Sequence, residues 1–273
     1  GMCECREVDA AGRGQPETDE ETSPVPAGHK RHELRTGRGD DTMRITVEGD
    51  RIVEVVKRAK RAEGDTHLRG VTLPGAANGH SHAFHRALRG RTHGEGGNFW
   101  TWRNQMYAVT ERLTPQTYRA LARAVFAEMV LAGYTVVGEF HYLHHGPQGR
   151  PYDNANAMGE AVIAAAQAAG IRLTLLDTLY LSGGLTGAGH LPLDPVQERF
   201  ADPDIAAWAR RIADLGDSPL CRIGVAAHSV RAVPREALLQ LASVAGSRVI
   251  HAHVSEQPAE NAACGLIYGM TPT

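Results

Sequence analysis

The sequence has no excess of charge, no long apolar run and few cysteines, and each absence excludes a class of protein. Its 29 basic and 31 acidic side chains nearly balance, so no overall field favours nucleic acid or an anionic membrane as a partner. No stretch approaches the roughly 18 consecutive apolar residues of a membrane-spanning helix, and the first residues lack the apolar segment of a signal peptide. We therefore expect neither a nucleic-acid nor a membrane partner.

The four cysteines do not form a disulfide framework. Cys3 and Cys5 lie in a polar N-terminal segment, whereas Cys221 and Cys264 fall within predicted helices or strands. A Cys-x-Cys pair can bind metal, but this one has no matching second pair. The cysteines therefore favour a reducing, cytoplasmic location.

Two His-x-His motifs are the most informative feature of the chain. His80 and His82 follow a short apolar run and a Pro-Gly breaker, and His251 and His253 close a second apolar run. On a strand, residues i and i+2 face the same side, so two imidazoles can bind one zinc or iron ion. A histidine-rich turn is the simpler alternative for one such pair alone. Two strand ends of this kind favour one metal centre at the edge of a parallel sheet.

Composition divides the chain into three segments. Residues 1–40 are polar, rich in Gly and Pro and almost without aliphatic periodicity, which predicts a disordered arm. Residues 41–74 contain two alternating segments joined by a Gly-Asp bend, which predict a β-hairpin, and then a strand over residues 68–73. We interpret this segment as part of a β-sandwich domain. Residues 75–273 form the third segment.

From residue 75 onward, predicted strands and helices alternate. The helices cover residues 114–133, 154–169, 203–215, 234–245 and 259–268, and the strands end near His80, His141, Leu176, Ala227 and His253. This alternation predicts βα units in a parallel sheet. Because three of the five strand ends carry histidine or glutamate, we favour an α/β fold with the first five units of a TIM-type (β/α) barrel. A doubly wound open sheet is the alternative, but no Gly-rich phosphate loop follows the first strand.

Five motifs together resemble those of the formimidoylglutamate deiminases, which belong to the metal-dependent amidohydrolase superfamily. They occupy residues 78–87, 99–103, 138–145, 228–233 and 251–257 and occur in the order found in that family. The Phe-Trp-Thr-Trp-Arg and His-Ser-x-Arg-Ala-Val segments are more specific than His-x-His. The resemblance implies a hydrolase that converts N-formimino-L-glutamate to N-formyl-L-glutamate and ammonia, a step of histidine degradation.

The resemblance also implies a metal centre and an acid/base group. His80, His82 and His253 match the ligands of one divalent ion, with zinc preferred and iron as the alternative. Glu256 matches the carboxylate that moves a proton from the attacking water to the leaving nitrogen. The alternative for Glu256 is an acidic residue that only stabilises a helix N-terminus.

The implied substrate carries two carboxylates, which require fixed cations. Arg231 and Arg103 match the residues that would bind them, because a guanidinium binds a carboxylate through two hydrogen bonds. Tyr142 offers a hydroxyl, His228 would contact the formimino end, and His85 stands where we expect a glutamine in other members. The alternatives are a surface arginine for Arg231, helix packing for Arg103 and a core histidine for His228.

The resemblance stops before the last strands of the family's barrel. Members of the family continue with another active-site histidine and a metal-binding aspartate, and no aspartate follows Glu256 here. We therefore expect an N-terminal fragment that is inactive as given, and we leave a homodimer open for the complete enzyme. A deaminase of a heterocycle such as guanine is a further alternative, although a neutral heterocycle needs no pair of arginines.

Overall fold

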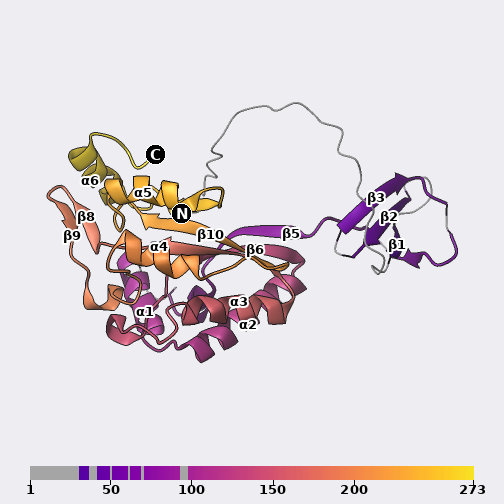
Figure 1. Cartoon of the computed structure of the whole chain (residues 1–273), viewed down its shortest axis with the longest axis horizontal. Coiled ribbons are helices and arrows are strands. Elements are labelled where there is room, and N and C mark those ends of the chain that lie inside the picture. The colour runs from indigo at the N-terminus through magenta and orange to yellow at the C-terminus, as the bar shows by residue number, and fades with distance from the viewer. Residues whose placement is uncertain (1–30, 37–41, 50, 61, 69–70, 93–97) are drawn as a thin grey trace. The chain divides into compact units, whose positions relative to one another are not determined.

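The computed structural model describes residues 31–36, 42–49, 51–60, 62–68, 71–92 and 98–273. They belong to two compact units, one ending at Pro74 and one running from Gly75 to Thr273 (Figure 1). Residues 1–30 and 37–40 of the predicted disordered arm lie outside the described residues. Residues 31–36 contradict that prediction, because they form strand β1 (Arg31–Thr36), whose backbone pairs with the next strand.

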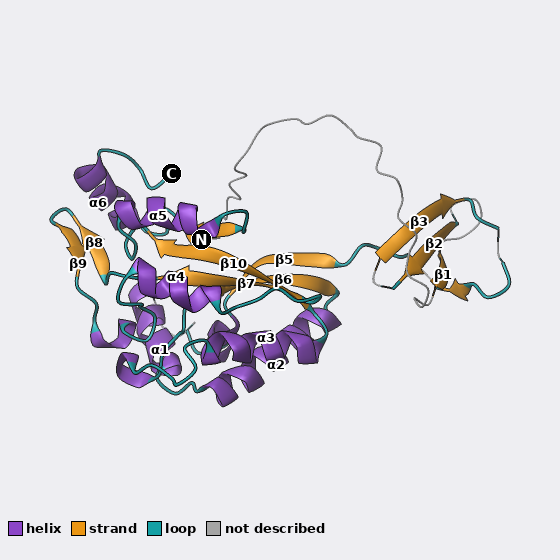
Figure 2. Cartoon of the chain, viewed as in Figure 1, coloured by secondary structure: helices purple, strands orange, loops and turns teal. Residues whose placement is uncertain are grey.

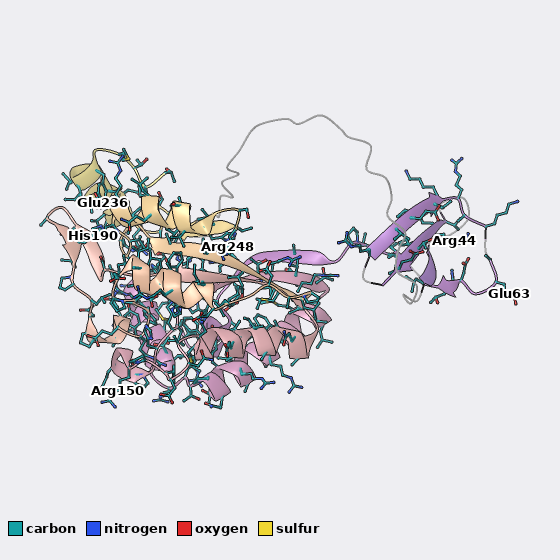
Figure 3. The ribbon with its side chains drawn as sticks, in the orientation of Figure 1. Arg44, Glu63, Arg150, His190, Glu236 and Arg248 are labelled. Carbon is teal, nitrogen blue, oxygen red and sulfur yellow. The ribbon has the colours of Figure 1, made fainter. Side chains whose placement is uncertain are left out.

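The smaller unit is a four-stranded sheet in the order β3-β2-β1-β4. Strands β2 (Met43–Glu48) and β3 (Arg51–Lys57) form the predicted antiparallel hairpin, and β4 (Thr66–His67) pairs with β1. Arg44 on β2, labelled in Figure 3, donates hydrogen bonds to the Lys60 carbonyl at 2.7 Å and to Asp65 at 3.0 Å. These bonds tie the loop after β3 to the sheet.

The described residues of the strand predicted over residues 68–73 form no strand. Residues 69 and 70 lie outside the described residues, and residues 71–75 have no regular structure. The strand of this region is β5 (Ala76–Ser81), which begins after Pro74 and pairs with β6 (Tyr134–His141). The prediction was based on apolar residues, whereas a strand forms where its backbone can pair with a neighbouring strand. His80 therefore lies within the strand rather than after it.

The larger unit contains the predicted parallel sheet. Its order is β11-β10-β7-β6-β5, so these five strands lie across the sheet in the order in which they occur along the chain. The remaining strands are β7 (Arg172–Leu179), β10 (Cys221–Ser229) and β11 (Ile250–His253). All four neighbouring pairs are parallel. This arrangement confirms an α/β fold with five strands of a TIM-type barrel (Figure 2).

Five helices confirm the predicted ones, with ends that differ by a few residues. They are α2 (Pro115–Leu131), α3 (Ala157–Ala169), α4 (Ile205–Ala213), α5 (Arg235–Ala245) and α6 (Pro258–Tyr268). The Thr114 hydroxyl caps α2 by accepting the backbone N–H of Thr117, and Gly170 ends α3 with φ 77° in the left-handed region that glycine adopts without strain. Within the described ranges, no helix is long and apolar enough to cross a membrane.

Several elements of the larger unit had no predicted bounds, and four of them bear on the site. They are the 3-10 helix η2 (Ala83–Leu88), helix α1 (Phe99–Thr110), and a hairpin of β8 (Gly184–Thr186) and β9 (Gly189–Leu191). The Asn98 side chain caps α1 by accepting the backbone N–H groups of Trp100 and Thr101. His190 of the hairpin, labelled in Figure 3, lies 3.0 Å from the Tyr268 hydroxyl of α6, measured from its Nε2.

A buried ion-pair network joins helix α4 to strand β7. Arg211 donates to Asp177 at 2.8 Å and to Asp202 at 2.7 Å, and all three side chains are at most 4% exposed. The Trp208 indole also donates to Asp177, at 3.1 Å. Burial raises the pKa of Asp177, but Arg211, His144 and His141 together lower it by more, so the net shift is downward. The ionised carboxylate of Asp177 therefore helps to hold helix α4 against strand β7.

We expect Asp177→Asn to lower the free energy of unfolding by about 3 kcal/mol, because it removes one partner of a buried charge. Urea unfolding of the parent and the variant measures the difference. The matched control is Asp217→Asn, which breaks an ion pair with Arg222 whose side chains are 53% and 70% exposed. The control should change stability by less than about 1 kcal/mol. Equal effects of the two variants would contradict a structural role for the network.

Candidate metal centre and cavity

The carboxyl ends of the five parallel strands surround one cavity of about 720 Å³. Each strand places a side chain there: His80 on β5, Tyr142 directly after β6, Tyr180 directly after β7, His228 on β10 and His253 on β11. The structure brings all the site residues predicted from the sequence into the lining of this cavity, namely His80, His82, His85, Arg103, Tyr142, His228, Arg231, His253 and Glu256.

Three histidine nitrogens converge on one point of the cavity. The Nε2 atoms of His80 and His82 are 3.1 Å apart, and that of His253 lies 3.2 Å from each of them. A tetrahedral zinc ion about 2.0–2.1 Å from each nitrogen would separate them by about 3.3 Å. The spacing therefore fits a single metal ion bound by three imidazoles.

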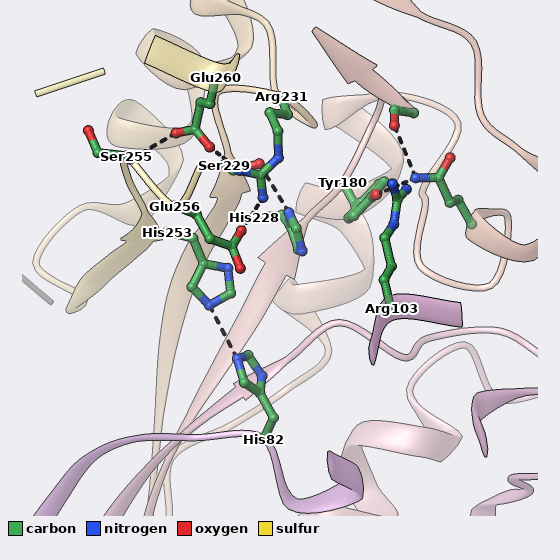
Figure 4. Close-up of polar contacts among 12 residues, drawn as sticks. His82, Arg103, Tyr180, His228, Ser229, Arg231, His253, Ser255, Glu256 and Glu260 are labelled. Atoms are coloured by element: carbon green, nitrogen blue, oxygen red, sulfur yellow. Dashed lines mark hydrogen bonds and ion pairs between the residues drawn. The ribbon is translucent and has the colours of Figure 1, made fainter. Parts of the chain in front are cut away.

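The protonation of these histidines also suits metal binding. His82 Nδ1 donates to the Phe140 carbonyl at 3.0 Å, which leaves Nε2 with a free lone pair. Burial lowers the pKa of His82 well below its usual value, and burial followed by the charge of His80 lowers the pKa of His253 to about 3. In Figure 4 a dashed line joins the facing nitrogen atoms of His82 and His253. Neutral imidazole is the form that binds metal.

Strand β6 positions the metal-site histidines without contributing a ligand. A Cβ atom on Gly138 would lie 2.7 Å from the Gly79 carbonyl oxygen, so only glycine lets β5 approach this closely. Glu139 accepts the backbone N–H of Ala83 at 2.6 Å, directly after His82, and burial raises the pKa of Glu139 to about 8. The Phe140 ring stacks on His253 with centroids 4.1 Å apart.

Arg231 lies between two carboxylates. Separate guanidinium nitrogens donate to Glu256 and to Glu260, and Figure 4 shows the three side chains together above His253. Glu260 also accepts the backbone N–H of Ser255 at 2.9 Å. Ser255 has φ 55°, a left-handed conformation that is costly for a residue with a Cβ. The bond from Ser255 to Glu260 therefore holds the strained turn that presents Glu256 to the cavity.

Arg103 has a different environment on helix α1. Its Nε donates to the Tyr107 hydroxyl at 2.5 Å, and its guanidinium lies 5.5 Å from the centroid of the Trp100 ring. No carboxylate of the described residues forms an ion pair with it. The cavity therefore contains a cation held by aromatic rings and available to an anion.

The remaining predicted residues form contacts across the cavity wall. His85 Nε2 lies 2.9 Å from the Tyr142 hydroxyl, and burial lowers the pKa of His85 to about 3. The His228 ring packs edge-on against Tyr142 at 5.2 Å and against Tyr180 at 4.6 Å, measured between centroids. These aromatic groups enclose the metal centre on one side.

Comparison with known proteins decides the family, because the model of the amidohydrolase family matches residues 71–273. The chain belongs to the amidohydrolase family. It is 35% identical over 236 residues to formimidoylglutamate deiminase of Pseudomonas aeruginosa, covering 84% of this chain and 51% of that protein. It is 28% identical over 236 residues to 8-oxoguanine deaminase of the same organism, covering 83% of this chain and 50% of that protein.

An amidohydrolase from Brucella melitensis has a similar solved structure, with a TM-score of 0.80 and 33% identity over 89% of this chain and 55% of that one. This amidohydrolase chain thus spans about half the length of the curated relatives it matches. The resemblance inferred from the five sequence motifs is confirmed.

Tyr180 and Glu260 are among the polar residues of the amidohydrolase cavity that the sequence did not predict. Tyr180 is the first residue after β7, as Tyr142 is after β6, so the rule that strand ends carry function would have found it. Glu260 lies four residues beyond Glu256, in the first turn of α6, and that spacing was the available signal. Both are buried.

A second group of potential metal ligands is buried elsewhere in the amidohydrolase unit. It consists of His141, His144 and Asp177. Asp177 already accepts hydrogen bonds from Trp208 and Arg211, and His144 Nε2 donates to a backbone carbonyl at 2.9 Å. These bonds belong to the network between β7 and α4.

Proposed function

We propose that the protein hydrolyses N-formimino-L-glutamate to N-formyl-L-glutamate and ammonia. The convergence of three imidazole Nε2 atoms in a cavity that also contains two arginines carries this proposal, because it pairs a metal centre with cations for a dicarboxylate. The 35% identity to a formimidoylglutamate deiminase supports it. The free thiols of Cys221 and Cys264 support a cytoplasmic location.

His80, His82 and His253 would hold one divalent ion, zinc in preference to iron, because imidazole suits both and the spacing suits a tetrahedral ion. When bound, such an ion lowers the pKa of water and polarises the C=N group. The water oxygen would bond to the formimino carbon and become the formyl oxygen, while both bonds of the C=N group break. Glu256 would take the two protons of the water in turn and pass them to the departing nitrogen, which leaves as ammonia.

The two arginines would bind the two substrate carboxylates. Arg103 needs an anion, since it has no carboxylate partner among the described residues. Arg231 donates through two of its five N–H groups to Glu256 and Glu260, so further donors remain for the substrate. Tyr142, held by His85, offers a hydroxyl to the substrate, and His228 would contact the formimino end.

Deamination of a heterocycle is the second candidate, and the 28% identity to 8-oxoguanine deaminase favours it. A neutral heterocycle would leave Arg103 in the cavity without an anion, which disfavours this alternative. Ammonia release from formiminoglutamate, guanine and 8-oxoguanine, measured on the zinc-supplemented complete gene product, separates the two. Rapid turnover of the purines without turnover of formiminoglutamate would reject our proposal.

We expect Arg231→Ala to lower kcat/KM for formiminoglutamate about 100-fold, since charged hydrogen bonds are worth up to about 3 kcal/mol. Steady-state ammonia release measures the effect. Because this variant also leaves Glu260 without its cation, Arg231→Lys is tested beside it and should still lose at least about 10-fold. The control is Arg248→Ala, whose side chain donates to the Val244 carbonyl outside the cavity. Unchanged kinetics in both Arg231 variants would show that Arg231 does not bind the substrate.

A further inference from the structure

The hydroxyl of Tyr180 belongs to the cavity but has no part in the function proposed above. Tyr180 is 5% exposed, lines the cavity and packs against His228. Figure 4 shows its ring beside Arg103, on the side of the cavity away from Glu260. A polar group in this place can contact a substrate that reaches Arg103.

Gln197 determines which way the Tyr180 hydroxyl points. The Gln197 Oε1 accepts the backbone N–H of Asp194 at 2.8 Å, and its Nε2 donates to the Gly183 carbonyl at 3.1 Å. Because a backbone N–H only donates and a carbonyl only accepts, these two bonds fix the orientation of the amide. The second hydrogen on Nε2 is then directed at the Tyr180 oxygen, 2.9 Å away. Tyr180 therefore accepts a hydrogen bond from Gln197.

The phenolic hydrogen of Tyr180 is left for another acceptor. No described residue other than Gln197 forms a hydrogen bond with this hydroxyl. Burial raises the pKa of Tyr180, so the hydroxyl keeps its proton at neutral pH. The charges of Arg103 and Arg231 oppose that rise, and Figure 4 shows the Arg103 side chain next to Tyr180. An anion bound by Arg103 would supply the missing acceptor.

We propose that Tyr180 is a substrate-binding residue that donates a hydrogen bond to one carboxylate of the substrate, beside Arg103. Gln197 is the positioning residue that directs this bond. The inference rests on the proposed function for the dicarboxylate nature of the substrate. Because Gln197 already orients the hydroxyl hydrogen, the hydroxyl loses less rotational freedom when a carboxylate binds. It therefore binds a carboxylate more tightly than a freely rotating hydroxyl would.

Glutarate is the probe for this site, because it has the two carboxylates of the substrate and no formimino group. Trp100 and Trp102 line the cavity, so tryptophan fluorescence can report its binding to the complete gene product. We expect Tyr180→Phe to weaken glutarate binding about 10-fold or more, and to raise KM for formiminoglutamate by a similar factor with little change in kcat. Tyr134→Phe, at the opposite end of β6 and outside the cavity lining, is the control and should change neither value.

Gln197→Leu tests the direction of the bond. We expect it to weaken glutarate binding about 3-fold to 5-fold in the parent and not at all in the Tyr180→Phe background, because its effect passes through the hydroxyl. Equal losses in both backgrounds would overturn the role of Gln197. A parent protein that fails to bind glutarate, or a Tyr180→Phe variant that binds it as tightly as the parent, would overturn the role of Tyr180. Glutarate binding that depends on Tyr180, without ammonia release from formiminoglutamate, would reject the proposed function alone.

Discussion

Replacing His82 with alanine is expected to remove most of the bound metal and nearly all ammonia release from formiminoglutamate. His82 Nε2 lies within 3.2 Å of the corresponding atoms of both other histidines, so its loss leaves two ligands for an ion that prefers at least three from the protein. Elemental analysis of the purified complete gene product gives the metal content per chain, and the same samples give the rate.

His67→Ala is the matched control, because His67 is exposed on β4 of the smaller unit. It should keep the metal content and the activity of the parent. A normal metal content in His82→Ala would exclude His82 as a ligand. Loss of metal in both variants would indicate general damage rather than removal of a ligand.

Replacing Glu256 with glutamine is expected to lower kcat about 10²-fold to 10⁴-fold, because an amide cannot accept and return the proton of the attacking water. The metal content and the affinity for glutarate should stay within about 3-fold of the parent, since glutamine has nearly the same shape. Steady-state kinetics, elemental analysis and fluorescence titration measure the three quantities on one preparation.

Glu236→Gln, on the exposed side of helix α5, serves as the control and should leave kcat unchanged. A Glu256→Gln variant with the kcat of the parent would leave Glu256 only the role of an acidic residue at the N-terminus of α6. A variant that also lost its metal would show that Glu256 supports the metal centre rather than proton transfer.

The metal-site geometry could be predicted from the sequence because it depends on regular structure. His80 and His82 share one side of a strand end, and the parallel sheet brings His253 to the same edge although it lies 171 residues beyond His82. The position of β5 could not be predicted, because residues 76–81 are small or polar and become a strand only by pairing with β6. Apolar periodicity does not report such pairing.

The environments of the two arginines could not be predicted either. Arg231 meets Glu256 and Glu260 only because the strained turn at Ser255 leads directly into α6. Gln197 reaches Tyr180 from the 3-10 turn η4 (Pro195–Gln197), and such turns follow no apolar period. Side chains on irregular segments are positioned by tertiary contacts, which local sequence patterns do not encode.

Gly138 lets strands β5 and β6 approach closely, and the affinity for metal depends on that approach. The missing Cβ lets the Gly79 carbonyl lie where a side chain would otherwise stand, and Gly79 directly precedes His80. A larger residue at position 138 would push β5 outward and spread the three nitrogens apart, although it would touch neither ion nor substrate. We therefore expect a substitution at position 138 to lower the affinity for metal, as the loss of a histidine ligand would. Few residues other than glycine should be tolerated there, although the position lies outside the metal site.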